Sequence, residues 1–561
     1  MISYSRWMAA RFNVASVEVD PSWEGAMDPR IILVNPSRKK NVGFSFIVPR
    51  WLVVLAEATP RKFGDPVLID ETIQSFDPAM VRPGDVVGIG INTMNCLSGY
   101  AAMREAKLRG ATVVVGGVHA TIVPEEALEF GADAVVTGNG DIIWQKVLED
   151  AFRNKLQKVY HGGRVSGDEL LPGRWDLLDT YRYMCPSVQT TAGCPENCTF
   201  CSVWVTEGRK PRQRSTDRII AEVNELSRLG FRVIILADDN FNPATQGRIA
   251  RETNRTVRKM LEQNREERLR FFESYDRGVA VKPAAFTQMT SEIVSDPEYL
   301  KASHDLVGVR AALIGVESFT DDGLKDVRKT WNKKGEEMLE TIQAIEAAGI
   351  SVLASIIFGL PSDTLETAST MREFAARSGA TAAQFTLYSP FLGTVDTSEM
   401  LRDRKMRATN RPLAEYQPRS PIQILGDPDY RFWLDEKLPR VVTIHPTMSS
   451  DEILQEIGKS WDSFYSFFST AKRAWLKQWS LKQKICFFLL EQGFRKFYGG
   501  YGISADSVSD KQLSRIARSS LKVAIEFYNR FFRRKEAKRL STQTSSAGLF
   551  SHEAKPSLRQ E

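Results

Sequence analysis

Three cysteines gather within eight positions of the chain. Cys194, Cys198 and Cys201 have the spacing C-x3-C-x2-C, and the other three cysteines of the 561-residue sequence lie far apart from one another. Clustered thiolates of this kind bind either a structural zinc ion or an iron–sulfur cluster. Structural zinc takes four protein ligands, whereas three thiolates leave one iron of a four-iron cluster open to a non-protein ligand. The spacing favours the cluster. Zinc, with Cys185 or His161 as the fourth ligand, is the alternative.

Strand-like and helix-length segments alternate after the linker that precedes these cysteines. From Val188 onward, strands are expected at 188–193, 233–238, 285–289, 311–317, 352–358 and 383–388. Helix-length segments such as 216–229, 335–348 and 366–377 lie between them. Such units build α/β barrels, whose chemistry lies at the carboxyl ends of the strands. We predict a partial (β/α)6 barrel over residues 188–395, with the cysteines at the end of its first strand.

A second set of β-branched runs occupies the first third of the chain. Strands are predicted at 30–36, 86–92, 112–116 and 134–137, with helices between them. Uninterrupted apolar strands joined by helices indicate a doubly wound parallel sheet, which binds ligands at the carboxyl ends of its strands. The loop residues expected there are Asn92, Thr93, Gly116, Gly117, His119, Gly138, Asn139 and Gly140. Residues 29–165 are therefore predicted to be a Rossmann-like, cofactor-binding domain.

The predicted fold class is α/β, with further segments around these two domains. Residues 1–28 are expected to form a leader, 166–187 a linker, 396–540 a mostly helical domain and 541–561 a disordered tail. With 42% hydrophobic and 26% charged residues, the composition is that of an ordinary globular protein. No apolar run approaches the roughly 20 residues that cross a bilayer, and the first residues lack the apolar core of a secretory signal. We expect a cytoplasmic protein.

The net charge of +6 is unevenly distributed along the chain. Residues 472–539 contain 17 Lys/Arg against 5 Asp/Glu, a local charge of +12 that leaves −6 for the remainder. Aromatic residues such as Trp475, Trp479 and Phe488 lie among these basic residues. Helices of this composition pack on a domain with their charges solvated, bind an anionic membrane surface, or bind nucleic acid. Packing of this region on the barrel and peripheral contact of this region with the inner membrane face are both kept as interpretations. A nucleic-acid partner is the least favoured of the three.

The cysteine motif, with the aromatic Phe200 before its last cysteine, resembles that of the radical S-adenosylmethionine enzymes. The resemblance implies that the three cysteines hold a 4Fe-4S cluster, and that S-adenosylmethionine chelates the fourth iron and yields a 5′-deoxyadenosyl radical when an electron enters. It also implies a set of residues that contact S-adenosylmethionine: Phe200, Asp238, Asp239, Asn240, Gln288, Glu317, Ser355 and Gly359. Ser355 and Ser362 depart from the family, which often has Gly and an acid at these positions.

The segment 116–141, GGVHATIVPEEALEFGADAVVTGNGD, resembles the cobalamin-binding domain that precedes the barrel in one large class of these enzymes. No G-x-G-x-x-G opens a helix after the first strand, which argues against a nicotinamide cofactor. Asn139 and Asp141 stand where members usually have two glutamates. None of the five histidines lies in a D-x-H-x-x-G motif, so we do not expect such a histidine on cobalt. His119 is expected near the nucleotide tail or the corrin; a satisfied loop histidine that caps a turn is the alternative.

Segments such as PRWLVVLAEATPRKFGDPVLIDETI (49–73) and YGGYGISADS (498–507) resemble the hopanoid C-3 methylases. The similarity extends over roughly residues 30 to 510 and implies the reaction. The implied enzyme removes hydrogen from an unactivated carbon of a hopanoid-type lipid and transfers methyl from methylcobalamin, with electrons from a flavodoxin or ferredoxin. The sequence offers no Ser-His-Asp or paired-carboxylate pattern, so no catalytic residue is predicted beyond the cluster ligands. The alternatives are a cobalamin-dependent radical cyclase or oxidase that transfers no methyl group, and a non-catalytic, metal-stabilised nucleic-acid binder.

Overall fold

The computed structural model describes most of the chain up to residue 495. It covers residues 29–38, 43, 45–408, 417–435 and 442–476, and single residues or pairs between 480 and 495. The predicted leader, the predicted tail and residues 496–540 of the predicted helical domain lie outside the described residues.

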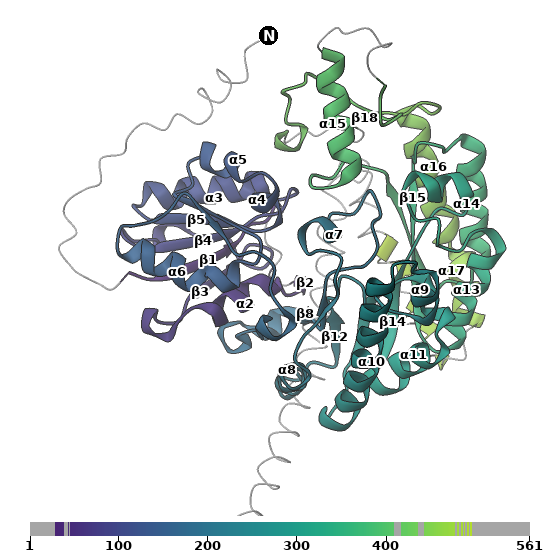
Figure 1. Ribbon diagram of the computed structural model, residues 1–561, viewed down its shortest axis with the longest axis horizontal. Helices are drawn as coiled ribbons and strands as arrows, with labels where there is room; N and C mark the ends of the chain where they lie inside the picture. Colours follow the sequence, from purple (N-terminus) through teal and green to yellow (C-terminus); the bar gives the residue numbers. More distant parts are fainter. Residues whose placement is uncertain are drawn as a thin grey trace, which may run out of the picture.

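The N-terminal domain is a six-stranded parallel sheet in the order β3-β1-β4-β5-β6-β7 (Figure 1). Its strands are β1 (Ile31–Asn35), β3 (Val67–Asp70), β4 (Val86–Gly90), β5 (Thr112–Gly116), β6 (Ala134–Thr137) and β7 (Val159–His161). The order reverses at β1, so a crevice for a ligand is expected beyond the carboxyl ends of β1 and β4. The predicted doubly wound sheet is confirmed. Strands β3 and β7 were not predicted, because four and three residues are too few to show a period.

Helices cover both faces of this sheet, which explains why its strands are apolar throughout. Helices α2 (Arg50–Ala58) and α6 (Gly140–Phe152) share a core with Ile31 and Leu33 of β1. Helices α3 (Cys96–Leu108), α4 (Val118–Ile122) and α5 (Pro124–Glu129) share the opposite core with Ile32 and Val34. Alternate residues of one strand thus enter two cores.

The second domain is a partial barrel of six parallel strands in the order β16-β15-β14-β13-β12-β9, as predicted. They are β9 (Ser187–Val188), β12 (Val233–Leu236), β13 (Ala284–Met289), β14 (Val309–Glu317), β15 (Ser351–Phe358) and β16 (Ala382–Leu387). The predicted first strand, 188–193, is wrong in its extent. The chain leaves the barrel after Val188, and β10 (Thr191–Ala192) pairs instead with β11 (Arg212–Gln213) in an antiparallel hairpin.

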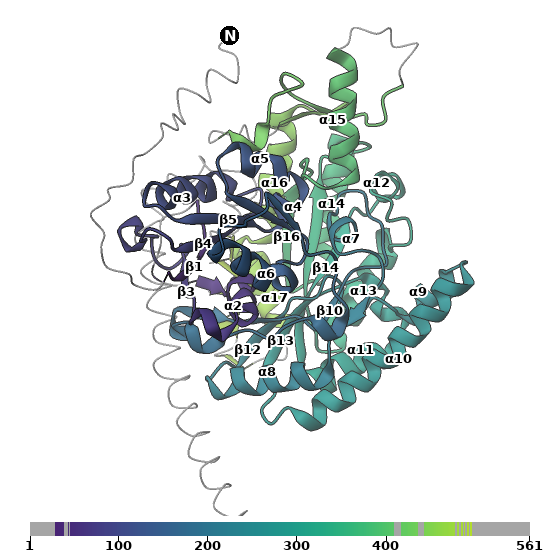
Figure 2. The same ribbon diagram turned by 60° about the vertical axis from the view of Figure 1, so that its left-hand side comes forward.

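Helices surround the barrel, and only some of them were predicted by residue range (Figures 1 and 2). Helices α8 (Thr216–Arg228), α11 (Pro297–Ala302), α13 (Gly335–Ala347) and α14 (Leu365–Arg377) follow the strands in turn. The long helix α10 (Arg255–Gly278) buries Phe271, Phe272 and Tyr275 on one face. Its other residues are mostly charged, so the sequence shows no run of apolar residues there.

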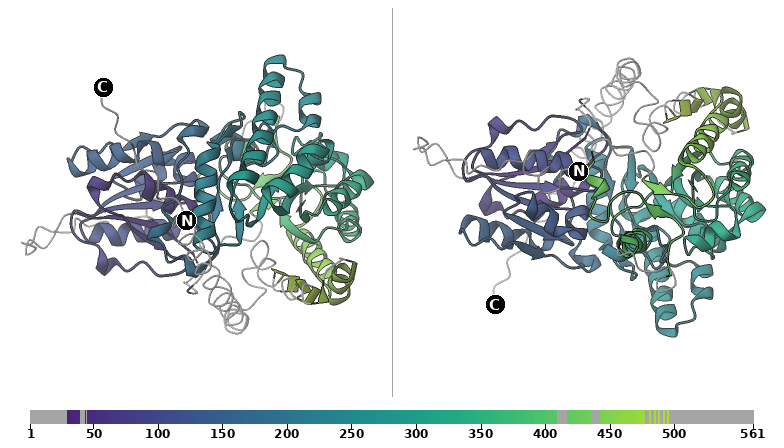
Figure 3. Two further views of the ribbon diagram at one scale, coloured as in Figure 1. Left: turned by 90° about the horizontal axis from the view of Figure 1, so that it is seen from below. Right: turned by 90° about the horizontal axis from the view of Figure 1, so that it is seen from above.

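The C-terminal segments pack on the open edge of the barrel and reach back to the N-terminal sheet. They comprise α15 (Val395–Ala408), the two-stranded β17 (Gln423–Ile424) and β18 (Thr443–Ile444), α16 (Ser450–Phe464) and α17 (Phe467–Leu476). Trp461 donates its indole N–H to the carbonyl of Phe385 at 3.1 Å, which fixes α16 on the edge strand β16. Figure 3 shows these last, yellow-green helices on the far side of the barrel from the N-terminal sheet. In its described part, the predicted helical domain therefore contains a small hairpin as well as helices.

Candidate functional site

The three cysteines lie in the loop between β10 and α7 (Val203–Thr206), on the side of the barrel that faces the N-terminal domain (Figure 1). Phe200, inside the loop, packs against an apolar core that contains residues of both the N-terminal domain and the barrel. The guanidinium of Arg164 also joins the two parts, since it donates to the carbonyls of Val205 and Thr206 at 2.7 and 3.0 Å. The predicted cluster ligands are thus placed at the domain interface.

All three thiols are free; Cys198 is buried, and Cys194 and Cys201 are partly buried. Burial raises the pKa of Cys194 and of Cys198 to about 12, and it also raises that of Cys201. A buried thiol loses its proton readily only to a metal centre or a nearby cation. This donor set, three thiols on one tight loop, fits a 4Fe-4S cluster with one open iron.

Asp238 fixes the turn between β9 and β10, which leads into the cysteine loop. Its fully buried carboxylate accepts hydrogen bonds from the amides of Thr190 and Thr191 at 2.6 and 3.0 Å and from the hydroxyl of Thr190. Arg268, from α10, lies 3.5 Å from the same carboxylate. These bonds explain why the chain turns away from the barrel after β9. The position of Asp238 corrects its predicted role, because it orders the loop rather than facing a ligand.

The next two predicted residues do face the loop. Asp239 accepts a hydrogen bond from the amide of Gly193 at 2.7 Å, and burial raises its pKa to about 6. Asn240 points its amide nitrogen toward the sulfur of Cys194 at 3.8 Å. An amide donor at a cluster sulfur stabilises charge on that sulfur.

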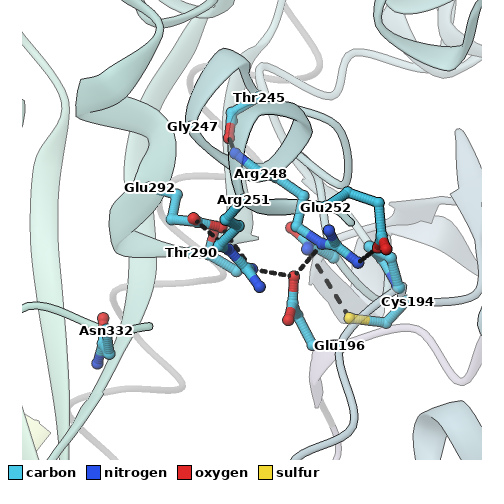
Figure 4. A network of polar contacts seen from close by, with 12 residues as sticks. Cys194, Glu196, Thr245, Gly247, Arg248, Arg251, Glu252, Thr290, Glu292 and Asn332 are labelled. Carbon is cyan, nitrogen blue, oxygen red and sulfur yellow. Dashed lines mark hydrogen bonds and ion pairs between the residues drawn. The ribbon is translucent and has the colours of Figure 1, made fainter. Parts of the chain in front are cut away.

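Two arginines of α9 (Gln246–Arg251) hold the loop from the side (Figure 4). Glu196, which lies between the first two cysteines, pairs with Arg251 at 2.6 Å and with Arg248 at 3.0 Å. Arg251 is held in turn by Glu292 at 2.8 Å. This network could not be predicted from the sequence, because charged residues so far apart along the chain give no sign that they are in contact.

A buried ion pair lies at the end of β14, where Glu317 was predicted as a site residue. Its carboxylate lies 2.8 Å from the ammonium of Lys329, which also donates to the carbonyl of Gly315 at 2.7 Å. Glu317 has a left-handed backbone, with φ of 62°, and the register with β15 shifts between Gly315 and Glu317. Lys329 was not predicted.

The remaining predicted residues lie at the same edge of the barrel sheet, because parallel neighbours end together. Gln288 is the exposed side chain of β13 and the last residue but one of that strand. Ser355 on β15 accepts a hydrogen bond from Gln384 of β16 at 2.8 Å. Gly359 follows β15 with φ of 83°, and its amide donates to Asp363 at 2.9 Å. The structure therefore brings Gln288, Glu317, Ser355 and Gly359 to the carboxyl ends of adjacent strands.

Exposed apolar side chains mark the corresponding edge of the N-terminal sheet. Met94, Val118 and Ile142 follow β4, β5 and β6, and they are 56%, 52% and 45% exposed. Gly117 and Gly138 have φ of 99° and 71°, and a Cβ at either would overlap neighbouring backbone. Tight loops with apolar side chains left open to solvent are typical of a ligand-binding surface. Such an edge fits a large ligand with an apolar face, as cobalamin has.

His119 does not lie on this open edge. Its ring is fully buried, with Nδ1 3.1 Å from the hydroxyl of Thr93 and Nε2 2.8 Å from the carboxylate of Glu126. Burial alone would raise the pKa of Glu126, but hydrogen bonds from His119, Trp433 and Tyr100 hold it below its usual value. Both ring nitrogens are engaged within the protein. This position supports the alternative of a satisfied loop histidine over the predicted contact with cobalamin.

Comparisons with known proteins agree with this architecture. Residues 188–375 match the radical SAM superfamily. The chain is 23% identical over 360 residues to bacteriochlorophyllide d C-12(1)-methyltransferase of Chlorobaculum tepidum, which covers 63% of this chain and 73% of that protein. It is 28% identical over 233 residues to hopanoid C-3 methylase of Methylococcus capsulatus, which covers 36% of this chain and 45% of that one.

A solved structure resembles the whole arrangement. The radical S-adenosylmethionine methyltransferase TsrM from Kitasatospora setae, with cobalamin and a [4Fe-4S] cluster bound, superposes with a TM-score of 0.59. The match covers 83% of this chain and 99% of that one at 16% identity, so it shows that the two proteins share a fold. The predicted resemblance is confirmed by these matches. The barrel that carries Cys194, Cys198 and Cys201 lies within the residues that match the radical SAM superfamily, and the chain is similar over more than half of its length to a named methyltransferase.

Proposed function

We propose that the protein is a cobalamin-dependent radical SAM methyltransferase that methylates an unactivated carbon. Cys194, Cys198 and Cys201 hold a 4Fe-4S cluster, whose open iron takes S-adenosylmethionine. Cobalamin binds over the edge formed by Met94, Val118 and Ile142. The observation that carries the proposal is that Arg164, just beyond the last strand of the N-terminal sheet with its exposed apolar edge, donates to the helix that follows the three-cysteine loop.

The bound groups supply the chemistry: a carbon radical from S-adenosylmethionine, and a methyl group carried on cobalamin. The residues of the chain hold these groups close together and away from water. Phe200 packs on the apolar core shared by the two domains, Asp238 fixes the turn that leads into the loop, and the pair Arg248 and Arg251 fixes the loop itself. Homolytic bond breaking at an sp3 carbon needs little acid or base from the protein, which fits the absence of a predicted acid–base pair.

The substrate class we propose is a polycyclic, hopanoid-type lipid. The similarity to hopanoid C-3 methylase supports it, although that match spans less than half of that enzyme. The electron donor we propose is of the flavodoxin or ferredoxin type. A cyclase or oxidase reaction without methyl transfer would use the same cofactors, and the product distinguishes the two.

Peripheral contact with a membrane is part of this proposal. Helix α17 and the residues after it expose large apolar side chains: Phe467, Phe468, Trp475, Leu476, Leu481 and Ile485. Phe468 is 82% exposed and Trp475 77%. Exposed aromatics within a strongly basic segment are typical of a surface that binds anionic lipid. Among the residues that the structure describes, no helix has the length and apolar character needed to span a bilayer.

Product mass tests the reaction. The protein, purified and reconstituted without oxygen, is given dithionite, S-adenosylmethionine, methylcobalamin and a hopanoid extract, and the lipids are compared by mass spectrometry with those from Cys198→Ala. A gain of one methylene, together with 5′-deoxyadenosine and S-adenosylhomocysteine, supports the proposal. Formation of 5′-deoxyadenosine with an oxidised or cyclised lipid and no added methylene would contradict methyl transfer.

A further inference from the structure

The ion pair between Glu317 and Lys329 is held by several independent features. Both side chains are buried, and Lys329 also donates to the carbonyl of Gly315. A Cβ at Gly315 would overlap both the carboxylate of Glu317 and the ammonium of Lys329. A glycine at this position of β14 is therefore required for the pair to lie across the strand.

The backbone on both sides of the pair is strained. Glu317 and Arg328, the neighbour of Lys329, have φ of 62° and 52°. They are two of the three non-glycine residues with a left-handed backbone in the described part of the chain. Such conformations cost free energy and persist where surrounding contacts enforce them, often at functional sites. The fold therefore holds Glu317 and Lys329 in place against a local preference.

The segment that carries Lys329 is tied directly to the cluster loop. Thr199, the residue after Cys198, donates its amide to the carbonyl of Val327 at 3.2 Å and its hydroxyl to the carbonyl of Asp326 at 3.4 Å. These bonds fix the distance between Lys329 and the loop. Although burial raises the pKa of Cys198, the nearby ammonium of Lys329 opposes that rise, and Glu317 adds to it.

Lys329 is also linked to the ion-pair network of Arg251 and Glu196, which fixes the cysteine loop. Its ammonium lies 5.3 Å from the centre of the Trp331 ring, and the guanidinium of Arg251 lies 4.8 Å from the same centre. Arg251 reaches Glu196 within the loop. The cations of Lys329 and Arg251 thus both contact the indole ring of Trp331, beside the cysteine loop.

We propose that Lys329 is a positioning residue that places a fixed positive charge beside Cys198, and that this charge raises the reduction potential of the cluster, with Glu317 limiting the rise. The inference rests on the proposed function, since it needs a cluster on Cys194, Cys198 and Cys201. One-electron reduction adds negative charge to the cluster, so a nearby fixed cation favours the reduced form and a nearby anion opposes it. Neither residue needs to exchange a proton for this effect.

The two single substitutions are expected to shift the midpoint potential of the cluster in opposite directions, which tests the proposal. The wild type, Lys329→Gln, Glu317→Gln and the double variant are reconstituted with iron and sulfide, and each cluster is titrated with dithionite and followed by electron paramagnetic resonance. We expect Lys329→Gln to shift the midpoint potential to more negative values, Glu317→Gln to more positive values, and the double variant to lie between them. Lys325→Gln, at an exposed pair with Asp322, is the matched control and leaves the potential unchanged.

A variant that does not fold, a shift of the potential in the wrong direction and the absence of a cluster lead to different conclusions. If Lys329→Gln fails to fold or to bind iron, Glu317→Gln still carries the test, because the ammonium stays in place and the predicted shift is positive. A shift of both single variants in the same direction, or no shift in Glu317→Gln, would overturn the proposal and leave the pair a structural one. Wild-type protein that takes up no cluster would instead refute the proposed function, which is a distinguishable result.

Discussion

The carboxylate of Glu126, in the N-terminal sheet domain, accepts a hydrogen bond at 2.9 Å from the indole nitrogen of Trp433, which lies 307 residues further along the chain. Arg431 adds a second tie, an ion pair with Glu129 at 2.7 Å. The carboxylate of Glu126 also accepts a hydrogen bond from His119, which contacts Thr93 at the edge proposed for cobalamin. The C-terminal segment is thus linked to that edge through three buried side chains.

Trp433→Phe should destabilise the protein by removing one donor from the buried carboxylate of Glu126. We expect a loss of about 1–3 kcal/mol in the free energy of unfolding, because Glu126 loses one buried donor, while the smaller phenyl ring keeps part of the apolar packing of the indole. The midpoint of thermal unfolding reports the change. Trp475→Phe, at an exposed site, is the matched control, and an equal effect of both substitutions would show that the link to Glu126 contributes nothing.

Arg251→Gln should loosen the cluster loop without unfolding the barrel. The substitution removes the cation from Glu292 and from the Trp331 ring face that Arg251 covers, and it leaves Glu196 paired with Arg248 alone. We expect the reconstituted cluster to lose iron to a chelator several times faster than in the wild type, with far-ultraviolet circular dichroism unchanged. Arg270→Gln, on the exposed side of α10, is the control. Equal rates of iron loss in wild type and Arg251→Gln would contradict the role given to this network.

Asp363 should make stability depend on pH. Burial raises its pKa to about 7, while one of its oxygens accepts the amides of Gly359 and Leu360 at 2.9 and 3.0 Å. Because the folded pKa exceeds the unfolded value of about 3.9, the folded state binds more protons, and this contribution falls as pH rises from about 4 to about 7. The slope is at most about 1.4 kcal/mol per pH unit.

Asp363→Asn should flatten this dependence, because an amide oxygen can still accept both backbone amides. Thermal midpoints measured between pH 5 and pH 8 show the effect, with the exposed Asp322→Asn as control. A variant as sensitive to pH as the wild type over this range would rule out Asp363 as the source.

Phe468→Glu should weaken binding to anionic vesicles about tenfold or more, since burying one aromatic side chain contributes about 1.5–3 kcal/mol. Sedimentation with phosphatidylcholine vesicles, with and without phosphatidylglycerol, measures the binding. We expect wild type to bind the anionic vesicles and to release them at high salt. Phe391→Glu, at an exposed position after β16, is the control. Failure of the wild type to bind either vesicle would refute the membrane contact.

Much of the fold could be predicted because its strands are apolar and regularly spaced. β4, β5 and β15 begin at or within two residues of the predicted positions. The cysteine loop was found from spacing alone. Helix α10 was missed because it packs its aromatic residues through one narrow face of a mostly charged segment.

The contacts that build the site could be predicted less well, because they depend on residues distant in sequence. Lys329 and Arg251 reach the cysteine loop only through the folded barrel. His119 was expected near the corrin, yet the fold places Glu126 and Thr93 against its two nitrogens. Asp238, at a strand end like a ligand-binding acid, binds backbone amides instead.

One chain is proposed to hold an iron–sulfur cluster and cobalamin at separate residues of a shared interface. Metal analysis of the wild type, Cys198→Ala and Val118→Glu, each reconstituted without oxygen, measures both groups at once. We expect about four irons and about one cobalt per wild-type chain, cobalt without iron in Cys198→Ala, and iron without cobalt in Val118→Glu. Wild-type protein that contains zinc and neither iron nor cobalt would contradict it.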